Sequence, residues 1–114
     1  MPGFEDLEVW KRSARLSADI YKTLATLKDF GFKDQITRSG LSIPSNIAEG
    51  AARKNKAEFI QFLHIALGSL SELETQLIIS KNLNYSKTIN GLLSKITNIR
   101  KMTFGLIKSI KNKS

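Results

Sequence analysis

The chain contains no cysteine and only one histidine, His64. Without cysteine, disulfides, zinc–thiolate sites and cysteine nucleophiles are excluded. Gln61 stands three positions before His64, so the Glu-x-x-His pairs that hold two iron ions in some helical bundles are absent as well. There is also no glycine-rich phosphate-binding loop. We therefore expect a protein that is not an enzyme and that uses no cofactor and no metal.

Long apolar runs are absent too. None reaches the roughly 18 residues that a helix needs to span a bilayer. Residues 1–6 lack the basic and apolar pattern of a secretory signal. These features predict a soluble protein of the cytoplasm, with no membrane as its partner.

Acidic residues are missing from the last third of the chain. Residues 1–74 hold ten basic and ten acidic side chains, whereas residues 75–114 hold eight basic ones and no acid, so the whole net charge of +8 lies there. Such an asymmetry favours a polyanionic partner, RNA or DNA, and less often an anionic membrane surface. On charge alone, a lysine-rich face that only keeps the protein soluble is an equal alternative.

Apolar residues recur at helical spacing in four segments of a single domain, residues 1–114. We place these helices at about 5–28, 33–51, 56–80 and 86–111. With short connections between them, they predict an all-α fold, an antiparallel up-down-up-down four-helix bundle. The apolar stripe of the first helix places Trp10 and Tyr21 in the core.

Local signals mark the expected helix ends. Gly31 is expected to end the first helix with a positive φ. Asn55 is expected to cap the third helix, with Glu58 reaching back to it, and Ser86 to cap the fourth. Gly68, in the middle of the third helix, predicts a close approach between two helices.

Pro44, one of only two prolines, lies inside the second helix, next to an unusual polar stripe. Its ring crowds the carbonyl group of Gly40, so we expect a kinked but continuous helix. Polar residues spaced four, three and four apart share one helical face here. We predict that this motif is an assembly element within the bundle or at a subunit contact, with a functional site as the alternative; its residues are Ser42, Pro44, Asn46, Glu49, Gly50 and Arg53.

Within this motif, Glu49 is expected to pair with Arg53 or with an arginine from another helix or subunit. Asn46 is expected to form a hydrogen bond across a helix contact.

The basic residues of the fourth helix and two arginines of the first are the candidates for binding nucleic acid. They are Lys87, Lys95, Arg100, Lys101, Lys108, Lys111, Arg12 and Arg15. Of the aromatic residues, only Tyr85, in a turn, is expected to be exposed beside lysines, where a base can stack on it. We therefore expect salt-sensitive binding to the phosphate backbone with little reading of sequence. The alternative is an oligomeric scaffold that binds proteins and has no nucleic-acid role.

The run Ser-Ile-Pro-Ser-Asn-Ile-Ala-Glu-Gly at residues 42–50, followed by Arg53 and Glu58-Phe59, resembles a known family. These are the four-helix bundle proteins encoded in intervening sequences of bacterial 23S ribosomal RNA genes. The resemblance extends to Phe4, Leu7, Val9 and Trp10, and covers nearly the whole chain. The chain departs from the family at residues 29–32, where a proline-containing loop is more usual, and at Ser39-Gly40.

That resemblance implies a homopentameric ring of bundles. It also implies a relationship to the accessory variability proteins of diversity-generating retroelements, which bind nucleic acid and a reverse transcriptase. A homopentamer and a reverse transcriptase or other protein are therefore expected partners.

Overall fold

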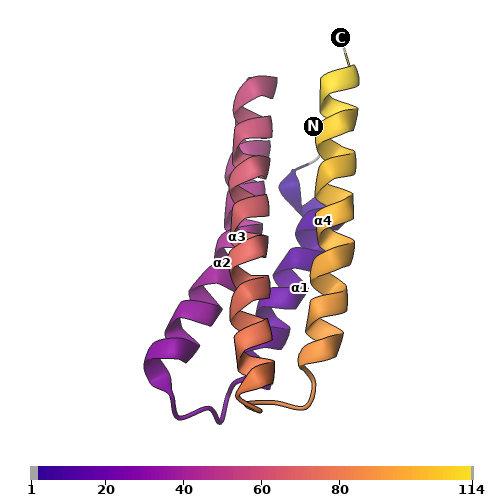
Figure 1. Cartoon of the computed structure of the whole chain (residues 1–114). Coiled ribbons are helices and arrows are strands. Elements are labelled where there is room, and N and C mark those ends of the chain that lie inside the picture. Colours follow the sequence, from indigo (N-terminus) through magenta and orange to yellow (C-terminus); the bar gives the residue numbers. More distant parts are fainter. Residues whose placement is uncertain (1–2, 114) are drawn as a thin grey trace.

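The computed structural model describes residues 3–113 and shows four helices packed side by side (Figure 1). A short 3-10 helix, η1 (Phe4–Asp6), precedes α1 (Glu8–Thr23), α2 (Phe30–Ala51), α3 (Lys56–Asn82) and α4 (Ile89–Asn112). No strand occurs within residues 3–113. The prediction of an all-helical protein with four helices is confirmed.

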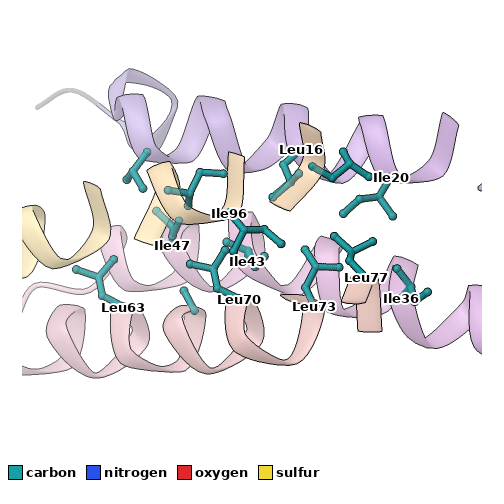
Figure 2. Packing of buried hydrophobic residues seen from close by; sticks show 14 of the residues in the cluster. Leu16, Ile20, Ile36, Ile43, Ile47, Leu63, Leu70, Leu73, Leu77 and Ile96 are labelled. Atoms are coloured by element: carbon teal, nitrogen blue, oxygen red, sulfur yellow. The ribbon is translucent and has the colours of Figure 1, made fainter. Parts of the chain in front are cut away.

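One hydrophobic core joins all four helices. Ile43 and Ile47 lie four residues apart on α2, and Leu63 and Leu70 lie seven residues apart on α3. None of these four side chains has exposed surface. Figure 2 shows these side chains meeting Leu16 and Ile20 of α1 and Ile96 of α4 between the ribbons. Trp10 packs at the edge of this core, but Tyr21 is 47% exposed, so its predicted place in the core is wrong.

α1 is shorter than predicted, and α2 begins earlier. α1 ends at Thr23, and residues 24–26 form a turn in which the amide of Leu24 still bonds to the carbonyl of Ile20 at 3.0 Å. Asp29 does not end α1 but caps α2, accepting a hydrogen bond from the amide of Phe32 at 3.3 Å. Gly31 lies inside α2, and no glycine in residues 3–113 has a positive φ, so its predicted role is wrong.

The connection between α3 and α4 also differs from the prediction. α3 ends in a Schellman motif. The amide of Tyr85 donates to the carbonyl of Ser80, and the amide of Asn84 donates to the carbonyl of Lys81, both at 3.0 Å. Asn84 takes the left-handed conformation, with φ at 57°. Ser86 does not cap α4, because its hydroxyl accepts the amide of Thr88, the residue at the cap position.

Two helix contacts depend on glycine, but Gly68 is not among them. A Cβ on Gly50 of α2 would lie 2.7 Å from Cβ of Phe62 on α3, and one on Gly40 would lie 3.0 Å from Cδ1 of Ile20 on α1. Around Gly68 there is open space, so the close approach predicted there is wrong. Asn55 caps α3 as predicted, accepting the amide of Glu58 at 3.1 Å.

α2 runs through Pro44 as one helix, in line with the prediction of a continuous segment. No helix within residues 3–113 is long and apolar enough to cross a membrane.

Candidate nucleic-acid interface

A groove of about 530 Å³ runs between α1 and α4 and gathers basic side chains from both helices. α1 contributes Lys11, Arg12 and Arg15, which all lie on one side of the helix, and α4 contributes Lys95. Among residues 3–113, Glu8 is the only acid lining the groove, whose floor includes Ile99, which is 1% exposed. The helices therefore place four cations around one concave surface.

Arg12, which lines the groove, is held by bonds to both helices. Its Nε lies 3.1 Å from Oε2 of Glu8, one turn earlier on α1, and its Nη1 donates to Oδ1 of Asn98 on α4 at 2.7 Å. The ion pair with Glu8 is half exposed, so solvent screening leaves it little effect on stability. Its main consequence is a guanidinium held in one orientation.

Lys95 spans the same pair of helices. Its Nζ lies 2.6 Å from Oδ2 of Asp19 on α1, and Asp19 is the less exposed partner, at 28% against 51%. Lys11 and Arg15 make no ion pair among residues 3–113. Two of the groove's four cations are thus matched by carboxylates of α1, and two are not.

Lys101 and Lys108 extend the basic surface along α4. Both are exposed, and they follow Ser94 and Asn98 at spacings of three, four or seven residues, which keeps them on one helical line. This line belongs to the last third of the chain, in which the sequence has no acidic residue.

The remaining candidates lie elsewhere. Arg100 turns toward α3, where its Nη2 donates to Oε1 of Glu74 at 2.9 Å and the pair is about 30% exposed. Lys111 follows Arg100 by eleven residues, about three helical turns, so it shares that side of α4. Lys87 is not on α4 at all but in the preceding loop, beside a separate hollow that Lys81 and Asn90 also line. The structure therefore unites only Arg12, Arg15 and Lys95 of the predicted set in the groove.

Lys11 belongs to the groove but was missing from the predicted set. Its sequence position offers a signal, since it precedes Arg15 by four residues and so shares a face with it. Asp19, which pairs with Lys95, could not be found this way, because the contact depends on how α1 and α4 pack together.

The polar stripe of α2 bonds within its own helix rather than across a contact. Nδ2 of Asn46 donates to the carbonyl of Ser42 at 2.7 Å, so the predicted bond across a helix contact is not formed. Glu49 is exposed and makes no ion pair within residues 3–113, so its predicted pairing with Arg53 is wrong. Pairing of Glu49 with another subunit stays a prediction.

Gly50 and Arg53 help to pack α2 against α3. The guanidinium carbon of Arg53 lies 5.0 Å from the centre of the Phe62 ring, and Gly50 lets Phe59 and Phe62 approach the backbone of α2. A second link between these helices runs from the hydroxyl of Ser39 to Oε1 of Glu72, at 3.0 Å.

Tyr85 connects two loops and is half-buried, so it is not the exposed stacking residue that the sequence favours. Its hydroxyl donates to Oδ2 of Asp29 at 3.2 Å, and its ring meets Phe32 edge-on with centres 6.0 Å apart. Burial, together with the hydrogen bond and the negative charge of Asp29, raises the pKa of Tyr85 above its usual value of 10.0.

His64 lies exposed on α3. Within residues 3–113 no three acidic or histidine side chains gather closely enough to hold a metal ion.

The fold and the groove define a class: a small, all-helical protein with one core and a basic surface formed by its first and last helices. The family model described as 23S rRNA-intervening sequence protein matches residues 5–105. The chain belongs to this family, as its sequence motifs indicate.

A solved structure supports the assignment. A crystal structure of a protein of unknown function from the S23 ribosomal protein family of Bacteroides thetaiotaomicron VPI-5482 is similar to the chain, with a TM-score of 0.82 and 32% identity. The match covers 88% of this chain and 98% of the other. No functionally curated protein matches the chain.

Proposed function

We propose that the protein is a non-enzymatic, oligomeric, cytoplasmic four-helix bundle that binds the phosphate backbone of RNA or DNA. The observation that carries this proposal is the gathering of Lys11, Arg12, Arg15 and Lys95 in one groove, continued along α4 by two exposed lysines. Cations on one accessible surface neutralise successive phosphates and release counterions, which is the main source of non-specific affinity.

The test compares two double charge reversals of equal net charge. Lys101→Glu with Lys108→Glu alters the exposed line of α4, whereas Lys28→Glu with Lys54→Glu alters two exposed lysines in loops. At low salt we expect the first pair to weaken RNA binding about tenfold and to flatten its salt dependence, and the second to change it little. Equal effects of the two pairs would exclude the exposed line of α4 from the binding surface, and no binding of RNA by the wild type at low salt would contradict the proposal.

The proposed oligomer is a homopentamer, with the antiparallel up-down-up-down order of helices in each subunit. The bonds that Arg12 donates to Asn98 and Lys95 donates to Asp19 support that order, because higher numbers on α1 meet lower numbers on α4. Pro44 is proposed to bend α2 by crowding the carbonyl of Gly40. A light-scattering mass of about five times the 12.7 kDa chain is the expected result.

Residues of the α2 motif are proposed to contribute to this assembly. Glu49 supports the idea, since it is exposed and has no ion-pair partner among the described residues of its own chain. Glu49→Ala is expected to lower the mass of the oligomer while leaving the helix content of the chain unchanged. Unchanged mass with weakened RNA binding would instead assign the motif to the binding site.

Exposed apolar side chains favour a second function, that of a scaffold for a protein such as a reverse transcriptase. Leu41 on α2 and Ile65 on α3 are 50% and 46% exposed, and Phe104 on α4 is 53% exposed. Association through such residues depends little on salt, which separates this function from phosphate binding.

A further inference from the structure

We infer that the α1–α4 groove binds a single strand of nucleic acid, in competition with the carboxylate that now holds Lys95. This inference rests on the proposed function and names the form of nucleic acid that the groove takes.

The groove follows the line along which α1 and α4 pack together, and this favours one strand over two. Packed helices lie about 8–10 Å apart, which leaves a furrow for one extended chain. A duplex instead presents two backbones on either side of a groove about 12 Å wide, so it would rest on the exposed ridge of α4. The volume of about 530 Å³ is in the range of sites that enclose small ligands.

The lining suits a nucleotide unit with its phosphate, sugar and base. Arg12 and Arg15 offer planar guanidinium groups, which bind phosphate through paired hydrogen bonds and stack on bases. Because Oδ1 of Asn98 already accepts from Arg12, its amide nitrogen remains as a donor. Ile99, at 1% exposure, only closes the floor of the groove and leaves the contacts to the polar side chains.

Two carboxylates of α1 compete with phosphates for cations of the groove: Glu8 lines the groove, and Asp19 lines the neighbouring hollow that Lys95 also borders. Glu8 pairs with Arg12, and Asp19 pairs with Lys95 at 2.6 Å. Arg12 keeps its bond to Asn98 when Glu8 is displaced, whereas Lys95 has no partner besides Asp19 among residues 3–113 and can turn to a phosphate. Asp19 therefore acts as an internal competitor for the strand.

Two isosteric variants test the role of Asp19. Asp19→Asn frees Lys95, and Asp34→Asn is the matched control, because it removes the same charge from an ion pair with Arg38 on α2. The probe is a fluorescent oligouridylate of about 12 nucleotides, read by anisotropy at low salt. We expect Asp19→Asn to tighten binding about threefold and the control to change it much less, since the released lysine gains one phosphate contact. Equal effects would overturn the role of Asp19.

The choice of strand is tested with the wild type and one groove variant. We expect the single strand to bind about tenfold more tightly than a duplex of equal length, and free uridine monophosphate to compete weakly. Arg15→Ala is expected to weaken binding of the single strand more than Lys54→Ala, a loop variant with the same charge change. Equal or tighter binding of the duplex, or equal effects of the two variants, would overturn the inference while leaving the proposed function intact. Binding of neither form at low salt would overturn both.

Discussion

Replacing Gly50 by alanine tests the packing of α2 against α3. A Cβ at this position would lie 2.7 Å from Cβ of Phe62, 3.0 Å from Cδ1 of Phe59 and 3.3 Å from its carbonyl oxygen. Cβ of Phe62 is attached directly to the backbone, so α3 itself must shift to make room. Overpacking of this kind costs about 1–3 kcal/mol.

The same substitution also brings a gain, because alanine favours the helix over glycine by about 1 kcal/mol. The tight backbone contact places the cost near its upper limit, so the net loss of stability is about 1–2 kcal/mol. For a domain of this size each kcal/mol lowers the melting temperature by about 4 °C, which predicts a fall of about 4–8 °C in thermal unfolding followed by circular dichroism.

Gly68→Ala is the matched control for this substitution. Gly68 is also inside a helix, but apart from that helix's own backbone no atom of residues 3–113 lies within 4 Å of the added Cβ. Only the helix preference remains, so the melting temperature is expected to rise by about 4 °C. Shifts of the same sign and size at both glycines would refute the close contact at Gly50.

Three further predictions concern single contacts. Asn84→Ala is expected to cost about 1 kcal/mol in urea unfolding and Asn84→Gly to cost nothing or to stabilise, because only glycine takes the positive φ freely; equal losses would contradict the left-handed cap. Glu74→Gln is expected to lower stability by up to about 1 kcal/mol at low salt and by less at high salt, since the ion pair with Arg100 is partly exposed; a loss that does not depend on salt would argue against it. Because the pKa of Tyr85 is raised in the folded protein, the contribution of its hydroxyl group to folding stability is complete below about pH 10. That contribution is lost as the pH rises through the folded-state pKa. The stability difference between wild type and Tyr85→Phe should therefore shrink only above about pH 10. A difference that shrinks already near neutral pH would show that ionisation of Tyr85 is not its cause.

The positions of the helices could be predicted from the sequence because their apolar residues follow the helical period over many turns. Their ends were harder, because the same residues signal a start or a stop. Asp29-Phe30-Gly31 reads as the end of α1, yet Asp29 accepts the amide of Phe32 and thereby opens α2. Ser86 and Thr88 both fit a cap, and only the fold shows that the Ser86 hydroxyl accepts the amide of Thr88.

The candidate interface was predictable only in part. Helical spacing alone places Arg100 and Lys111 on a different side of the fourth helix from Lys101 and Lys108. The cations that gather in the groove come from helices more than sixty residues apart in the sequence. Their meeting depends on the register of α1 against α4, as in the contact of Arg12 with Asn98, and no local pattern encodes that register.

The salt dependence of RNA binding by the wild-type protein tests the proposed function most directly. If the basic surface of α1 and α4 neutralises three to six phosphates, the logarithm of the affinity for a single strand should fall linearly with the logarithm of salt, with a slope of about −2 to −4. A slope near zero, or no binding at about 50 mM salt, would contradict a phosphate-binding role for this surface.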